Sequence, residues 1–142
     1  MSLLVISDKI HHPVYQTLPF EVETLEPHCP DLTCHIKVCY SEIVLLDGSF
    51  DAGIGLQLLK DIKMMRPDLP VIFIADASSE DMVIKAFKAG AREYFKKPFD
   101  TFELRGTIIN LIRIKKETRE RRSSLRENSA YSEKDVAVPI SD

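Results

Sequence analysis

Three charged residues, Asp8, Asp47 and Lys97, stand out because each lies at the end of a short segment of strand-like sequence. Two carboxylates held close together repel each other unless a cation lies between them. Oxygen ligands on loops, too few for a closed cage, suit a Mg²⁺ ion that keeps several of its waters. A neighbouring lysine can pair with a phosphoryl group, and a carboxylate can act as the nucleophile that forms an aspartyl phosphate. Together the three residues are competent for phosphoryl acceptance at Asp47.

Each of these residues also has a plainer interpretation when it is taken alone. Asp8 and Asp47 can be ordinary loop aspartates, and Lys97 can be a surface lysine whose stem packs along apolar surface. Phosphoryl chemistry is favoured only if the three side chains meet at one edge of a sheet. The elements that position them therefore decide between the two interpretations.

Five segments have the character of strands. The runs 3–6, 43–46 and 71–74 are continuously apolar, which is typical of strands buried on both faces. Residues 20–25 alternate apolar and polar side chains, which predicts a strand with one wet face near a sheet edge. Residues 93–97 form a last short strand that Pro98 closes.

Apolar residues at helical spacing predict the helices between these strands. Leu56, Leu59 and Ile62 form one stripe that begins after a glycine-rich turn and ends before Pro67. A second helix is expected from Ser78 or Ser79 to Ala89, with Gly90 as its stop. Its inward residues are predicted to be Met82, Val83, Ala86 and Phe87.

The remaining helical segments are less evenly defined. Asp100 and Glu103 have the spacing of a capping box, and apolar residues follow at helical period. Residues 11–18 suit a short helix, whereas the pattern of 29–40 leaves helix and loop both open. The apolar residues of the last helix are Phe102, Ile108, Ile109 and Ile112.

Strands and helices alternate along the chain. This alternation predicts an α/β fold, a doubly wound, flavodoxin-like five-stranded parallel sheet with helices on both faces. Open parallel sheets bind ligands at the carboxyl ends of their strands, and Asp47 is expected at the end of a central strand. The fold therefore favours the phosphoryl chemistry.

Composition limits the class of protein and its localisation. The chain has 142 residues, 44% hydrophobic and 29% charged, with a net charge of −3, which suits a globular domain with a core of its own. No apolar run approaches the ~20 residues of a membrane span, and the start of the chain does not resemble a signal peptide. A cytoplasmic protein without membrane contact is predicted.

The three cysteines, Cys29, Cys34 and Cys39, match no common zinc spacing. They are interpreted as reduced thiols, with their role left open.

A basic run follows residue 112. It favours a solvated helical extension, with Glu117 and Arg121 as an i,i+4 pair, over a nucleic-acid contact, because no aromatic residue is interleaved. The predicted organisation is a domain over 1–113 and, over 114–142, a basic helix followed by a mobile tail (128–142) or a linker to a missing effector domain. The basic residues are Arg113, Lys115, Lys116, Arg119, Arg121, Arg122 and Arg126.

Several stretches together resemble the response-regulator receiver domain of bacterial two-component signalling. The resemblance covers about residues 3 to 113 and is specific as a set, although each piece alone is weak. The stretches are Val5-Ile6-Ser7-Asp8, Ile43-Val44-Leu45-Leu46-Asp47, Gly55-Leu56, Pro67-Asp68-Leu69-Pro70-Val71-Ile72, Ala89-Gly90-Ala91-Arg92-Glu93-Tyr94, Lys97-Pro98-Phe99 and Glu103-Leu104.

The resemblance implies roles for individual residues. Asp47 is the implied phosphoacceptor, and Asp8, Asp47 and the backbone carbonyl of Ser49 are the implied ligands of Mg²⁺. Lys97 would contact the phosphoryl group, with a cis Lys97–Pro98 bond. Tyr94 would be the aromatic residue that changes position in the switch.

Two departures from the family pattern bear on these roles. Ser7 replaces the first of two acidic residues, so it would hold the metal through a water and Mg²⁺ binding would be weak. Ala75 stands where the family has Thr or Ser, so no hydroxyl links a phosphoryl group to Tyr94 unless Ser78 supplies one. We expect Tyr94 to turn inward, at least part of the time, without phosphorylation.

The predicted function is that of a phosphoacceptor in two-component signal transduction and not that of an enzyme, beyond assisting its own phosphoryl transfer and hydrolysis. A sensor histidine kinase would donate the phosphoryl group, and the signal would leave through the last strand and its flanking helices, with a homodimer through the same face or an effector domain beyond the chain as recipients. The alternative is a pseudo-receiver, a protein-interaction module that signals without phosphorylation. Direct nucleic-acid binding has only the basic run in its favour.

Overall fold

The structure of the protein is a computed structural model. It describes residues 2–7, 15, 18–38, 40–48, 51–76 and 80–136, with the backbone alone at 52 and 123–136. The sites predicted at Asp8, Ser49 and Ser78 therefore lie outside the described residues.

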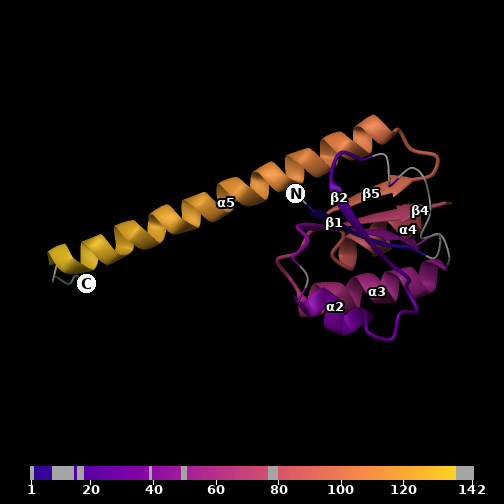
Figure 1. Ribbon diagram of the computed structural model, residues 1–142, viewed down its shortest axis with the longest axis horizontal. Helices are drawn as coiled ribbons and strands as arrows, with labels where there is room; N and C mark the ends of the chain where they lie inside the picture. Colours follow the sequence, from indigo (N-terminus) through magenta and orange to yellow (C-terminus); the bar gives the residue numbers. More distant parts are fainter. Residues whose placement is uncertain are drawn as a thin grey trace. The chain divides into compact units, whose positions relative to one another are not determined.

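A five-stranded parallel sheet forms the centre of the fold (Figure 1). Its strands lie in the order β2-β1-β3-β4-β5, and all four neighbouring pairs are parallel. This is the doubly wound arrangement predicted from the alternating pattern. The strands are β1 (Ser2–Ile6), β2 (Glu21–Leu25), β3 (Ile43–Asp47), β4 (Val71–Ala75) and β5 (Glu93–Lys96).

Burial follows the position of each strand in the sheet. Every residue of β3 and β4 is buried, because these strands have neighbours on both sides and packed layers on both faces. The alternating strand β2 is an edge strand and is only half buried, as its sequence predicts. The continuous apolar runs therefore mark the interior of the sheet correctly.

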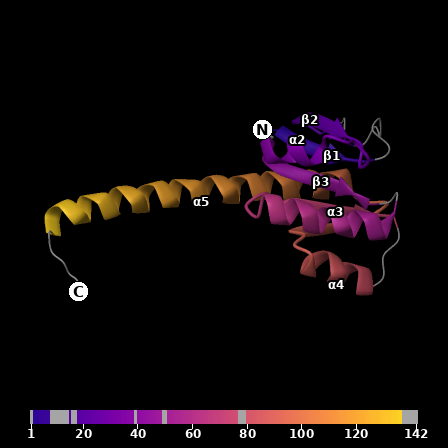
Figure 2. The same ribbon diagram turned by 90° about the horizontal axis from the view of Figure 1, so that it is seen from below.

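Three helices lie in a row along one face of the sheet (Figures 1 and 2). The first, α2 (Leu32–Val38), lies within the segment 29–40 whose pattern left helix and loop both open. It is followed by α3 (Ala52–Met65) and α4 (Glu80–Lys88). The core beneath them takes alternate residues from the three inner strands β1, β3 and β4, as the two-residue period of a strand requires. These strand residues are Leu4, Ile6, Val44, Leu46, Val71, Phe73 and Ala75.

The opposite face of the sheet is covered by the first turns of α5 (Thr101–Val136) (Figure 1). Leu104 and Ile108 of these turns are fully buried. The predicted helix 11–18 is described only at Tyr15, which is helical, and at Leu18, and both side chains are buried.

The glycine-rich turn predicted before α3 is wrong, because Gly53 and Gly55 lie in the first turn of the helix itself. The N-cap is the residue that precedes the helix, which the sequence pattern did not single out. The Asp51 side chain accepts a hydrogen bond from the Ile54 backbone N–H at 3.0 Å and caps α3. Asp100 accepts one from the Phe102 N–H at 2.8 Å at the start of α5. Gly90 follows α4 with φ of +111°, a conformation that favours glycine.

Three apolar residues of the predicted helix stripes are exposed. Phe87 was expected to point inward from α4, but it is 46% exposed. The inward stripe of α4 is narrow and is centred on Ala86, which is fully buried, so Phe87 lies at its margin. Phe102 and Ile109 on α5 are likewise exposed, whereas Ile108 and Ile112 are buried.

Contacts divide the chain into two compact units, residues 1–108 and 109–142. The second unit is helical to Val136, so the helix extends into the stretch 128–142 that was expected to be a tail. Arg113, Lys116 and Arg119 are exposed on it, in agreement with a solvated face. Among the residues described, no helix is long and apolar enough to cross a membrane.

Candidate functional site

Asp47 is the last residue of β3, between β1 and β4 in the middle of the sheet. Its side chain is only 1% exposed, and it follows four buried apolar residues. A buried carboxylate is costly unless it is paired and hydrogen-bonded. Its partners therefore define the site.

Lys97 is the first of these partners. Its Nζ lies 2.7 Å from Asp47 Oδ2, and its side chain is only 14% exposed. The Lys97 backbone N–H donates to the Ala75 carbonyl oxygen at 2.8 Å, which fixes the end of β5 beside β4. The Lys97–Pro98 peptide is cis, as expected. The structure thus brings together two of the three charged residues that the sequence singles out.

Tyr15 is the second partner, and sequence reasoning missed it. Its hydroxyl donates a hydrogen bond of 2.8 Å to Asp47 Oδ2, and its side chain is 1% exposed. Burial raises the pKa of the Tyr15 phenol well above its usual value, with further contributions from the charge of Asp47, the hydrogen bond to it and the charge of Asp76. Tyr15 is therefore a neutral donor to a buried carboxylate.

Only one signal in the sequence could have pointed to Tyr15. A tyrosine that is buried usually finds a partner for its hydroxyl. Tyr15 is the one tyrosine between the first two strands, but that fact does not predict which residue its hydroxyl meets.

Two further predicted residues lie at the same edge of the sheet. Ser7 follows β1, is 1% exposed, and its backbone N–H donates to the Leu25 carbonyl at 3.1 Å. Ala75 ends β4 and is 3% exposed. Ser7, Asp47 and Ala75 thus end three adjacent strands.

The Phe73 ring supports this edge from the side of the helices. A Cβ on Gly48 would lie 2.6 Å from Phe73 Cζ, and one on Gly55 would lie 3.2 Å from the same atom. The two glycines therefore let the chain that follows Asp47 pass close to this ring. Tyr94 packs on its far side, with 5.8 Å between ring centroids, and the Tyr94 hydroxyl is buried without a hydrogen-bond partner among the residues described.

The chemistry of the donors suits a hard cation. The Asp47 carboxylate and the Ser7 hydroxyl offer oxygen atoms, the type of donor that Mg²⁺ prefers. The part of the chain that the structure describes holds no group of three or more His, Cys, Asp or Glu able to bind a metal. Asp8 and Ser49, which complete the predicted set, fall in the gaps between the described ranges.

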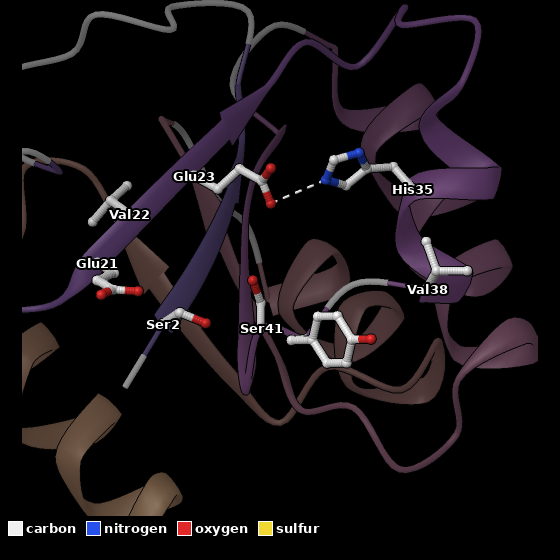
Figure 3. A pocket seen from close by; sticks show the side chains of 8 residues that line it. Ser2, Glu21, Val22, Glu23, His35, Val38 and Ser41 are labelled. Atoms are coloured by element: carbon white, nitrogen blue, oxygen red, sulfur yellow. Dashed lines mark ion pairs between the residues drawn. The ribbon is translucent and has the colours of Figure 1, made fainter.

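A hollow lies at the opposite edge of the sheet from Asp47, where β1, β2 and β3 begin. It has a volume of about 470 Å³ and is crossed by an ion pair of 3.0 Å between His35 Nε2 and Glu23 Oε1 (Figure 3). The other lining residues are Ser2, Glu21, Val22, Val38, Tyr40 and Ser41. Cys29 and Cys34 are free thiols outside both sites.

Comparison with known proteins gives consistent results. The family model of the response regulator receiver domain matches residues 31–109, more than half of the chain. Over 123 residues the chain is 31% identical to the transcriptional regulatory protein KdpE of Staphylococcus aureus (strain NCTC 8325 / PS 47). That alignment covers 84% of this chain and 53% of KdpE. The chain spans about half, or less, of the length of the curated relatives it matches.

Solved structures agree in fold. A receiver domain protein (CheY-like) from Methanospirillum hungatei JF-1 matches with a TM-score of 0.71 at 21% identity, over 82% of this chain and 97% of the other. The beryllofluoride-activated NtrC4 receiver domain dimer matches with a TM-score of 0.68 at 25% identity, over 80% of this chain and 98% of the other. Both likenesses support the sheet order found here.

Proposed function

The chain belongs to the response regulator receiver domain family of two-component signalling, and from that premise we propose that Asp47 accepts a phosphoryl group from a sensor histidine kinase. The observation that carries this proposal is the buried Asp47 carboxylate paired with Lys97 at 2.7 Å. A carboxylate oxygen attacks the phosphorus atom, and the bond from phosphorus to the donor nitrogen breaks. The Lys97 ammonium lies where it can pair with the incoming phosphoryl oxygens.

Mg²⁺ is the cofactor of this proposal. Asp8 and Asp47, the Ser49 carbonyl and a water on Ser7 would hold the ion, which would neutralise charge on the phosphoryl group. Because Ser7 replaces a carboxylate, binding is weak. Receiver domains are regulatory, and we propose that catalysis by this chain is limited to its own phosphorylation and hydrolysis.

We propose that the Tyr94 ring already occupies its inward position, at least part of the time, before phosphorylation. Ala75 has no hydroxyl to draw toward a phosphoryl group, and its small side chain leaves room for Tyr94. The buried Tyr94 hydroxyl and the contact with Phe73 support an inward ring. Replacing Ala75 with Thr would restore the hydroxyl and enlarge the response around Tyr94. Equal, large amide shifts around Tyr94 in wild type and Ala75→Thr, on addition of beryllium fluoride, would contradict this.

The signal is proposed to leave through β5 and its flanking helices, either to a second copy or to an effector domain beyond this chain. Apolar side chains exposed near this face support a docking role, namely Ile84 (50%), Phe87 (46%) and Phe102 (76%). The greater length of the curated relatives is consistent with a further domain.

The decisive experiment is intact mass after incubation with acetyl phosphate and Mg²⁺. Wild type and Asp61→Ala, which alters an exposed residue of α3, are expected to gain one phosphoryl mass that is labile in alkali and to gain none without Mg²⁺. Asp47→Ala is expected to gain no adduct. Asp8→Ala is expected to gain none even with Mg²⁺ present, because it would lose a ligand of the metal. No adduct on wild type would overturn the proposal and leave the pseudo-receiver, which uses the same face without phosphorylation.

A further inference from the structure

Two donors converge on a single oxygen of the phosphoacceptor. Lys97 Nζ lies 2.7 Å and the Tyr15 hydroxyl oxygen 2.8 Å from Asp47 Oδ2. All three side chains are shielded from solvent, with exposed fractions of 14% for Lys97 and 1% for each of the others. Water therefore competes little with either contact.

These contacts limit what Oδ2 can do. A carboxylate oxygen has two lone pairs in the plane of the group, and the two donors occupy that capacity. To form a bond to phosphorus, Oδ2 must use one of these lone pairs. At least one of its two donors must then withdraw.

Tyr15 is the donor that loses its bond. The Lys97 ammonium remains attracted by charge, because the added phosphoryl group is an anion beside it. The Tyr15 hydroxyl is neutral, and its acceptor Oδ2 becomes the bridging oxygen of an acyl phosphate, which is a far weaker acceptor than a carboxylate oxygen. The hydrogen bond of Tyr15 therefore stabilises the unphosphorylated site more than the phosphorylated one.

We propose that Oδ2 is the Asp47 oxygen that bonds to phosphorus, and that Tyr15 is a positioning residue that holds this oxygen in the unphosphorylated carboxylate and slows its phosphorylation. This inference rests on the proposed function, since it concerns the rate of the same reaction. In the step, a lone pair of Oδ2 forms the O–P bond, and the P–O bond to acetate breaks with its electron pair on the leaving acetate. Tyr15 keeps its proton and gives up only its acceptor.

The release of Tyr15 also supplies a contact that differs between the two states, which any switch needs. Ala75 offers no hydroxyl for that purpose, whereas the Tyr15 hydroxyl is already bonded to Asp47. The first helical segment of the chain, rather than the end of β4, thus carries the hydroxyl that responds to Asp47.

The test measures the initial rate of phosphorylation of the full chain by acetyl phosphate with Mg²⁺, followed by intact mass. Tyr15→Phe removes the hydroxyl and keeps the ring. Tyr40→Phe is the matched control, because Tyr40 is 96% exposed at the opposite edge of the sheet. We expect Tyr15→Phe to react about tenfold faster than wild type, as loss of one hydrogen bond to a charged group allows, and Tyr40→Phe to match wild type.

Other outcomes separate the two proposals. Adducts on wild type and Tyr15→Phe at equal rates, or a slower Tyr15→Phe, would overturn the role of Tyr15 alone. No adduct on either protein would overturn the phosphoacceptor proposal and the role of Tyr15 with it. As a second measurement, beryllium fluoride with Mg²⁺ should bind Tyr15→Phe more tightly than wild type, and unchanged affinity would contradict the inference. A protein in which Tyr15 merely fills space would show neither gain.

Discussion

The pair Asp47–Lys97 and the pair Glu23–His35 are of similar length, 2.7 and 3.0 Å, but they lie at opposite edges of the sheet. The first pair is shielded, with exposed fractions of 1% and 14%. The second is open to solvent, at 49% for Glu23 and 35% for His35. Distance alone therefore does not distinguish them.

The difference in solvent access gives the two pairs different energetics. A pair in water gains little, because solvent screens the charges and two long side chains must be ordered. A shielded pair has lost its hydration, so removing one partner leaves a buried charge without its counter-charge. The carboxyl edge of the sheet therefore holds a carboxylate under tight constraint, whereas the amino edge holds an ordinary surface contact.

The largest expected effect is on stability when the shielded pair is broken. Lys97→Met should lower the free energy of unfolding by about 3 kcal/mol, because the Asp47 carboxylate stays buried while its cationic partner is lost. Denaturant unfolding measures this change. The control Glu23→Gln should cost less than about 1 kcal/mol. Equal losses in both variants would mean that burial does not separate the two edges.

The second largest loss of stability is expected when the packing behind the carboxyl edge of the sheet is disturbed. Gly48→Ala would place a Cβ 2.6 Å from the Phe73 ring, so we expect a loss of about 2 kcal/mol in the free energy of unfolding.

Gly106 in α5 provides the control for Gly48. A Cβ there meets nothing within 4 Å, and Gly106→Ala should stabilise the helix by about 1 kcal/mol. Thermal or denaturant unfolding of both variants should therefore give opposite signs. A neutral Gly48→Ala would show that the Phe73 ring yields easily.

A smaller effect is expected at the helix that follows β3. Asp51→Ala removes the acceptor for the Ile54 N–H at the start of α3 and should cost about 1 kcal/mol. Asp51→Ser, which keeps a capping oxygen, should recover most of that loss. If Ser is no better than Ala in denaturant unfolding, the cap does not contribute to this edge.

The smallest effect should be the coupling between Glu23 and His35. A double-mutant cycle with Glu23→Gln and His35→Gln should give a coupling of roughly 0.5 kcal/mol in low salt. The coupling should vanish in 1 M NaCl, where the screening length is about 3 Å. A coupling that survives high salt would indicate that this pair is less open to solvent than its exposure implies.

The sequence by itself determined most of the sheet. Continuous apolar runs at 43–46 and 71–74 became the buried strands β3 and β4, and the alternating segment 20–25 became the edge strand β2. Apolar residues alternate along a strand that is covered on one face and run continuously along a strand that is covered on both. The burial of a strand can therefore be read from its own short segment of sequence. The same logic placed Asp47 and Lys97 at one edge, where they meet at 2.7 Å.

Local sequence patterns predicted the burial of helix residues less accurately than the burial of strands. Phe87 has the spacing of an inward residue on α4 but is 46% exposed, whereas Ala86 beside it is fully buried. Hydrophobic periodicity predicts which side of a helix faces the core, but not how wide the contact is. That width depends on the distance between the helix and the sheet.

Tyr15 shows what only the tertiary structure decided. Its hydroxyl reaches an acceptor 32 residues away in sequence, and no spacing rule links the two positions. The contact exists because β1 and β3 are neighbours in the sheet, which brings the helical residue after β1 above the end of β3. The sequence determined that a carboxylate and a lysine would share one edge. The packing of the chain around that edge decided that a buried tyrosine would share the same carboxylate oxygen.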